Sequence, residues 1–119
     1  RQVVAFDALT GQVRWRTMIG PTESSPLVHQ GRVYVGDWRG RVYALNEKTS
    51  RIVWSFQTDG RVKGAVAALG IRVFVGAYDG RLDALDSRTG ALHWRSSSQG
   101  RLGGLGRFRG TPLLVLGHE

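Results

Sequence analysis

Residues 5–15 of the chain read AFDALTGQVRW, and this eleven-residue stretch returns twice without a gap. The second copy, residues 44–54, reads ALNEKTSRIVW, and the third copy, residues 84–94, reads ALDSRTGALHW. The closing tryptophans are separated by 39 and then 40 residues. A second block, VYVG at residues 33–36, returns as VFVG at residues 73–76, again 40 residues on. Two blocks that share one spacing identify an internal repeat.

Short alternating apolar runs bounded by turn residues predict strands along the whole chain. We expect strands at residues 3–7, 12–17, 25–29, 32–37, 41–46, 51–57, 62–68, 72–77, 81–86, 91–96, 102–108 and 112–117. No segment has a sustained 3.6-residue period, so we expect almost no helix. Repeats of about 40 residues with four strands each are typical of β-propeller blades. The sequence therefore predicts an all-β β-propeller fragment.

The predicted strands group into blades of four, labelled A to D from the central channel outward. We expect residues 1–119 to form a single partial propeller domain with a C–D half-blade at 1–20, whole blades at 24–57 and 62–96, and an A–B half-blade at 101–119. That makes about three blade equivalents, whereas known propellers have about four to eight. We expect the remaining blades to come from a longer polypeptide. Head-to-tail association of two copies into six blades is the alternative.

Each copy of the motif places small, polar and aromatic residues at fixed positions. The motif positions are Ala5, Asp7, Thr10, Gly11 and Trp15; Ala44, Asn46, Thr49 and Trp54; and Ala84, Asp86, Thr89, Gly90 and Trp94. The Asp and Asn side chains can accept hydrogen bonds from backbone N–H groups across a turn, and the Thr hydroxyls can form additional hydrogen bonds there. Glycine supplies positive φ, and each tryptophan brings a large apolar area to one site per repeat. We interpret these tryptophans as structural.

The pattern Ala-x-Asp-x-x-Thr-Gly-x-x-x-Trp resembles the tryptophan-docking motif of the pyrroloquinoline-quinone (PQQ) repeat family. The resemblance runs from about residue 4 to residue 96, with Asn46 and Ser50 departing from the pattern in the second copy. That family includes quinoprotein alcohol dehydrogenases, BamB-type lipoproteins of outer-membrane assembly, and extracellular sensor domains of bacterial kinases. The resemblance implies that each tryptophan docks between adjacent blades.

Residue chemistry favours a non-catalytic role. The chain has no cysteine and only nine acidic residues, and its three histidines have no metal-site spacing. We therefore predict no catalytic, cofactor-binding or metal-binding residue. The leading hypothesis is a bacterial, extracytoplasmic scaffold for protein–protein interaction, BamB-like or sensor-domain-like. The alternative is a fragment of a PQQ-dependent dehydrogenase, and only that alternative implies PQQ and calcium.

A candidate interaction face lies at the hairpins between strands B and C. Trp38 is the one tryptophan outside the repeat, it is followed by Arg39, and Tyr78 is its equivalent one blade later. Arg41 and Arg81 follow these two hairpins at matching positions. Aromatic residues beside arginine are typical of interfaces, although a ring that covers the end of a blade is an alternative interpretation of Trp38.

The formal charge of +8 comes from 15 arginines and two lysines against the nine acidic residues. A positive field favours anionic partners, and binding of anionic polymer is a weaker alternative function. The arginines are dispersed along the repeats, so we expect a solvated surface and no nucleic-acid partner. No apolar run approaches the roughly 18 residues needed to span a membrane, and no signal peptide is present in the given chain. The lack of cysteine suits an oxidising, extracytoplasmic compartment.

Overall fold

The computed structural model describes residues 2–22, 26–58, 66–76, 81–97, 102–107 and 114–118. This part of the chain contains twelve strands and no helix, so no described segment is a helix that could cross a membrane. The strands are β1 (Gln2–Phe6), β2 (Val13–Met18), β3 (Leu27–His29), β4 (Arg32–Gly36), β5 (Arg41–Asn46), β6 (Ile52–Gln57), β7 (Ala67–Leu69), β8 (Arg72–Gly76), β9 (Arg81–Asp86), β10 (Leu92–Ser97), β11 (Leu102–Arg107) and β12 (Leu114–His118).

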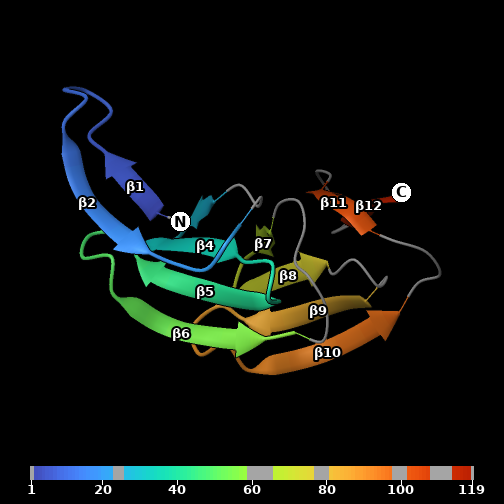
Figure 1. The fold of residues 1–119 in the computed structure, drawn as a ribbon. Helices are drawn as coiled ribbons and strands as arrows, with labels where there is room; N and C mark the ends of the chain where they lie inside the picture. Colours follow the sequence, from blue (N-terminus) through green and yellow to red (C-terminus); the bar gives the residue numbers. More distant parts are fainter. Residues whose placement is uncertain are drawn as a thin grey trace.

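These strands form two four-stranded antiparallel sheets and two hairpins. The sheets have the orders β3-β4-β5-β6 and β7-β8-β9-β10, and the hairpins are β1-β2 and β11-β12. In Figure 1 the two sheets stack on each other, and the hairpins lie toward opposite ends of the molecule. The predicted fold class, two whole blades with a C–D and an A–B half-blade, is confirmed.

The innermost strands are shorter than the sequence predicts. β3 begins at Leu27, two residues later than expected, directly after Pro26. Proline has no N–H to give to a strand ladder, which accounts for the late start. β7 covers Ala67–Leu69, and residues 62–65 of the strand predicted there lie outside the described residues.

The strand register repeats from blade to blade. Val33 lies opposite Leu45, and Val73 lies opposite Leu85 in the next blade. Each motif alanine also lies opposite its own tryptophan; the pairs are Ala5 with Trp15, Ala44 with Trp54, and Ala84 with Trp94. The small residue thus faces the largest residue across the C–D pair. An irregularity in the register falls next to this pair in all three copies.

The main core lies between the two whole blades. Its buried members are Tyr34, Val42, Ala44, Trp54, Val66, Ala68, Val73, Val75 and Leu85. The rings of Tyr34 and Trp54 are tilted, with centroids 5.9 Å apart. Full burial of one aliphatic or aromatic side chain stabilises a fold by about 1.5–3 kcal/mol, so this interface holds the blades together.

Both outer faces of this pair of blades are also apolar. Strands β4 and β5 turn alternate residues toward the β1-β2 hairpin, where Val33, Val35 and Leu45 pack with Val3 and Ile19. A third cluster lies on the other face of the last whole blade, and its buried members are Phe74, Leu82 and Ala84. Whole blades therefore need a neighbour on both sides.

Trp54 joins one blade to the next through a polar contact as well as an apolar one. Its indole Nε1–H donates to the carbonyl oxygen of Ser87 at 2.8 Å, and its ring lies over Gly90. Gly90 has φ +78°, and a Cβ at this position would come within 2.6 Å of Trp54 Cε3. Glycine is therefore required at position 90 for two reasons: its backbone conformation and the close approach of the Trp54 ring.

We expect Gly90→Ala to lower the free energy of unfolding by roughly 2–5 kcal/mol. About 1–2 kcal/mol comes from the left-handed backbone, and about 1–3 kcal/mol comes from overpacking against Trp54. Gly31→Ala is the matched control, because Gly31 has φ +79° and nothing lies within 4 Å of an added Cβ. Urea denaturation followed by circular dichroism compares the variants. Equal losses would show that the indole does not restrict this turn.

Candidate functional site

The hairpin between β4 and β5 carries the predicted interaction face. Hydrogen bonds to Asp37 hold the conformation of this hairpin. Asp37 is only 1 % exposed. Its Oδ1 accepts hydrogen bonds from the backbone N–H groups of Arg39, at 2.9 Å, and Arg41, at 3.0 Å. Its Oδ2 accepts a hydrogen bond from the Tyr43 hydroxyl at 3.2 Å. One buried carboxylate therefore satisfies three donors and sets the shape of the hairpin.

The surroundings of Asp37 are tightly packed. A Cβ on Gly20 would come within 2.6 Å of Asp37 Oδ2, so only glycine lets the chain after β2 pass this close. Burial raises the pKa of the Tyr43 hydroxyl, and the neighbouring charge of Asp37 raises it further. A tyrosine held protonated remains a donor to the carboxylate.

The side chains on this hairpin are presented outward on a rigid support. Trp38 is 41 % exposed, and its backbone N–H donates to the Pro21 carbonyl at 2.7 Å. The Arg39 carbonyl accepts a hydrogen bond from Gln57 Nε2 at 2.7 Å. Arg41 donates through Nη1 to Ser55 Oγ at 2.9 Å. The structure thus brings Trp38, Arg39 and Arg41 together on one hairpin.

The corresponding face of the next blade is described only in part. Arg81 is the first residue of β9, as Arg41 is the first residue of β5. Tyr78, the predicted aromatic residue of that hairpin, lies outside the described residues.

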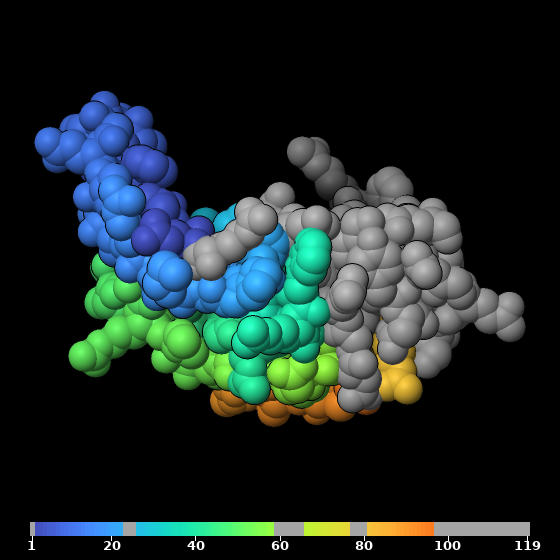
Figure 2. Space-filling view, in the orientation of Figure 1, coloured from blue at the N-terminus to red at the C-terminus, as the bar shows by residue number. Residues whose placement is uncertain are grey.

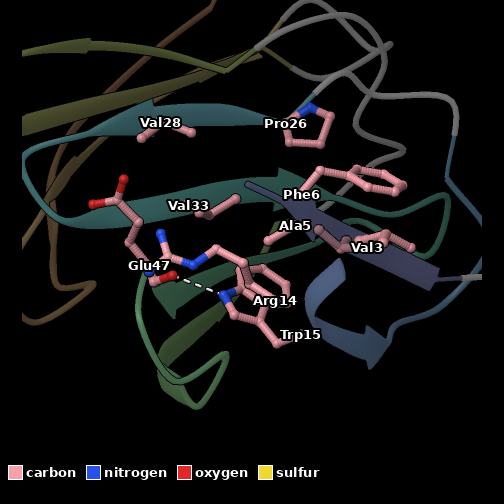
Figure 3. A pocket seen from close by; sticks show the side chains of 10 residues that line it. Val3, Ala5, Phe6, Arg14, Trp15, Pro26, Val28, Val33 and Glu47 are labelled. Atoms are coloured by element: carbon pink, nitrogen blue, oxygen red, sulfur yellow. Dashed lines mark hydrogen bonds between the residues drawn. The ribbon is translucent and has the colours of Figure 1, made fainter. Parts of the chain in front are cut away.

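A groove of about 280 Å³ runs beside β1, and it was not predicted from the sequence. Val3 and Phe6 of β1 line one side, and Pro26, Val28 and Val33 line the other, as Figure 3 shows. The groove exists because no described strand pairs with the outer edge of β1. No local sequence signal locates the groove, because β1 and β3 belong to different sheets.

The motif turns between strands C and D share one hydrogen-bond pattern. Asp7 Oδ1 accepts from the backbone N–H groups of Leu9 and Thr10, at 2.8 and 3.1 Å. Asn46 Oδ1 makes the same two contacts, with Lys48 and Thr49, at the same distances. The threonine hydroxyls Thr10, Thr49 and Thr89 each accept from a backbone N–H two residues on.

The third motif turn adds an ion pair. Asp86 accepts from the backbone N–H of Arg88 at 2.8 Å and pairs with the Arg88 guanidinium at 2.8 Å. The side-chain hydrogen bond from Arg88 and then its backbone N–H hold the pKa of Asp86 well below its usual range. The backbone N–H groups of Leu9 and Thr10 contribute most to lowering the pKa of Asp7, and the charge of Arg14 lowers it further.

The three motif tryptophans differ in their environment. Trp15 Nε1 donates to the Glu47 carbonyl at 2.7 Å, as Trp54 does to Ser87 one blade later. Trp94 is 39 % exposed, against 7 % for Trp54, and its ring touches that of Phe74. Two of the three tryptophans therefore reach into the turn of the following blade.

The buried carboxylates among the described residues are engaged by donors within their own blades. No group of three or more His, Cys, Asp or Glu that could hold a metal ion occurs among the described residues. The buried carboxylate of Asp83 pairs with Arg95, with Nε–Oδ1 at 2.7 Å, and Asp37 is engaged by the hairpin. Both carboxylates thus take part in contacts that hold the blade structure.

A family model described as outer membrane protein assembly factor BamB matches residues 1–118. The chain belongs to this family. Membership accounts for the repeated blades and for the recurrence of the eleven-residue motif.

Individual BamB proteins match over part of their length. The outer membrane protein assembly factor BamB of Yersinia pestis is 38% identical over 58 residues, which are 48% of this chain and 15% of that protein. The crystal structure of BamB from Moraxella catarrhalis superposes with a TM-score of 0.75 at 29% identity, over 81% of this chain and 31% of that one. The aligned part of this chain thus spans less than a third of either relative.

A quinoprotein has a similar structure. Quinohemoprotein alcohol dehydrogenase from Comamonas testosteroni matches with a TM-score of 0.67 at 29% identity, over 82% of this chain and 17% of that one. Fold alone does not imply the dehydrogenase reaction, because function resides in sites placed on a fold.

We expect Asp86→Asn to reduce the acid sensitivity of this BamB-family chain. A carboxylate with a lowered folded-state pKa stabilises the fold above its unfolded pKa of about 3.9, and this stabilisation is lost as the pH falls. Asn at position 86 can keep the turn acceptor, as Asn46 does, but it cannot titrate. The drop in melting temperature from pH 6 to pH 3 should therefore be smaller than in the parent chain.

Asn46→Asp is the reciprocal control and should enlarge that drop, because it adds a titrating carboxylate to an equivalent turn. If Asp86→Asn and the parent chain lost the same melting temperature on acidification, the ion pair of Asp86 with Arg88 would have no part in acid stability.

Proposed function

We propose that the chain is part of a non-catalytic, extracytoplasmic β-propeller scaffold that binds proteins, as a BamB-like protein or a sensor domain would. The observation that carries this proposal is the BamB family match along residues 1–118. A chain without cysteine is also suited to an oxidising compartment. No PQQ or calcium is required for this role.

The hairpin of Trp38, Arg39 and Arg41 is the proposed contact surface for a protein partner. Tryptophan and arginine contribute strongly to protein interfaces, because each buries a large area and still offers hydrogen bonds. The support from Asp37 limits the conformational entropy that binding would cost. The proposed partner surface is therefore ordered before contact.

A chimera tests the proposal. The blades of Yersinia pestis BamB that correspond to residues 1–118 in the family alignment are replaced by those of this chain, and outer-membrane protein levels are measured in cells that lack their own BamB. We expect the chimera to restore these levels. Replacing Trp38, Arg39 and Arg41 together by Ala should reduce restoration at least several-fold while the amount of chimera stays constant.

The control for the chimera replaces Arg14, Arg16 and Arg51 by Ala, which removes three positive charges away from the hairpin, against two in the hairpin variant. If both triple variants restored protein levels equally, the hairpin would not be the partner surface. If only the control variant failed, the weaker alternative of anionic-polymer binding through dispersed arginines would be favoured.

A fragment of a PQQ-dependent dehydrogenase is the second candidate, and the similarity to quinohemoprotein alcohol dehydrogenase favours it. The described residues provide no cluster for calcium. We expect no change in the absorbance spectrum of PQQ when the chain is added together with calcium. A saturable spectral change that requires calcium would contradict the scaffold proposal.

A further inference from the structure

Arg32, the first residue of β4, carries a charge that has no partner among the described residues. Its Nη1 is enclosed by protein and has no hydrogen-bond acceptor. The residue as a whole is half-buried, and it makes no hydrogen bond or ion pair with any residue that the structure describes. An arginine side chain stays protonated and offers only donors. Because a buried donor without an acceptor is costly, the guanidinium needs an acceptor from elsewhere.

Arg72 takes the same position in the second whole blade, and there the blade itself supplies acceptors. The Nη2–H of Arg72 donates to Nε2 of His93 at 3.0 Å. Asp86 lies directly opposite Arg72 in the sheet. The hydrogen bonds of Arg88 do most to lower the pKa of Asp86, and the charge of Arg72 lowers it further. The second blade therefore matches this arginine with a carboxylate and an imidazole.

The first whole blade has lost both of these acceptors. Asn46 lies opposite Arg32, where the second blade has Asp86. Val53 stands at the position of His93, directly before the motif tryptophan. Side chains directly opposite each other on one face of an antiparallel pair have Cβ atoms about 5 Å apart, so Asn46 is within reach of the guanidinium.

The orientation of the Asn46 amide leaves a donor where the second blade has an acceptor. Its Oδ1 accepts hydrogen bonds from the backbone N–H groups of Lys48 and Thr49, at 2.8 and 3.1 Å. The other amide atom is therefore Nδ2, which can only donate. It corresponds to Oδ2 of Asp86, the oxygen that pairs with a guanidinium in the second blade. Arg32 and Asn46 thus both offer donors and lack a common acceptor.

Two neighbouring titratable side chains do not supply that acceptor. Alternate residues of a strand face opposite sides, so Arg32 faces the second whole blade together with Tyr34. Glu47 lines the groove beside β1, on the other face of the first blade, as Figure 3 shows. His29 faces Arg32 across β3 and β4, but its Nε2 donates to the Gly70 carbonyl at 3.0 Å.

The adjoining turn adds a second positive charge. Lys48 stands at the position of Arg88 and is exposed. Arg72 and Arg88 share the carboxylate of Asp86, whereas Arg32 and Lys48 have only the neutral amide between them. In Figure 2 the turn between β5 and β6, coloured green, lies at the surface of the molecule, where a solute can reach it.

From this pair of blades we infer that the first whole blade binds a small oxyanion of the phosphate class between β4 and the turn at residues 47–50. Its oxygens accept hydrogen bonds from the Arg32 guanidinium and from Nδ2 of Asn46, and the Lys48 ammonium group adds charge. Arginine binds phosphate oxygens through paired N–H groups. Two positive charges favour a doubly charged phosphate over a singly charged carboxylate.

The site lies at the opposite end of β4 from the hairpin of Trp38. All of its residues belong to a whole blade whose four strands are paired. The inference therefore does not depend on the proposed partner surface.

Equilibrium dialysis of the 119-residue chain against radiolabelled inorganic phosphate tests the site directly. We expect saturable binding at millimolar phosphate or below. Arg32→Gln should raise the dissociation constant roughly tenfold or more, because it removes the paired N–H groups and the charge. The matched control is Arg16→Gln, which makes the same change on β2, an exposed position away from the site, and it should stay within about twofold of the parent. Equal constants for the two variants, or no saturable binding by the parent chain, would overturn the inference.

Asn46→Asp tests the same site with a variant that keeps the fold, since Asp7 and Asp86 occupy this position in the other two motif turns. The new carboxylate supplies the missing acceptor from within the chain. We therefore expect this variant to lose phosphate binding and to melt at a higher temperature than the parent in phosphate-free buffer at neutral pH. Phosphate binding as tight as that of the parent would overturn the inference.

Melting temperatures in phosphate and in acetate, each at an ionic strength matched with sodium chloride, distinguish the two oxyanions. Millimolar phosphate should raise the melting temperature of the parent chain more than acetate does, and it should leave Asn46→Asp nearly unchanged. A larger effect of acetate would overturn the phosphate class. Equal shifts in the parent and in Asn46→Asp would reveal the general effect of an excluded salt and would overturn the site.

Discussion

The hydrogen bond from the indole of Trp54 to the carbonyl of Ser87 is the constraint on which the arrangement of blades depends. It joins residues 33 positions apart, one on the outermost strand of a blade and the other in a turn of the next. The ring then rests on Gly90, so the distance between two sheets is set by contact with backbone and not by flexible side chains. Apolar packing such as that of Val42, Val73 and Leu85 supplies most of the stabilisation but little direction. The hydrogen bond of the indole sets the orientation of one blade relative to the next.

The contact is weaker where the motif departs from its pattern. Ser50 stands at the position of Gly90 and adopts φ 65°, a conformation that costs a residue with a Cβ about 1–2 kcal/mol. In the repeat, the Cβ of Ser50 corresponds to the Cβ that at Gly90 would meet the ring of Trp54. Trp15 keeps its hydrogen bond to Glu47 but is less deeply buried than Trp54. The two tryptophans thus keep the same hydrogen bond and differ in burial.

The sequence allowed the strands and blades to be predicted, because period-two alternation and turn residues are local signals that recur every 40 residues. It also suggested that Trp38, Arg39 and Arg41 share a hairpin, and the structure places them on one. It gave no sign that Asp37 is buried, since an acidic residue beside Trp38 in a turn is usually solvated. Burial of Asp37 depends on Gly20 and Tyr43, which come from other strands or loops. The groove could not be predicted either, because it is formed by the edge of one sheet and the face of another.

The two whole blades place their buried carboxylates at different positions. In the first, Asp37 anchors the hairpin and Tyr43 supports it from the neighbouring strand. In the second, the sequence has Ala77 in place of Asp37 and Asp83 in place of Tyr43, and the Asp83 carboxylate pairs with Arg95 across β9 and β10. A buried carboxylate needs donors wherever it stands. Asp83 finds its donor in the guanidinium of Arg95 on the neighbouring strand, whereas Asp37 finds its donors in the backbone of its own hairpin. Since β4 pairs with β5 in the same register as β8 with β9, the hydrogen bonds of Asp37 anchor the hairpin of Trp38 without a change in the fold of the blade.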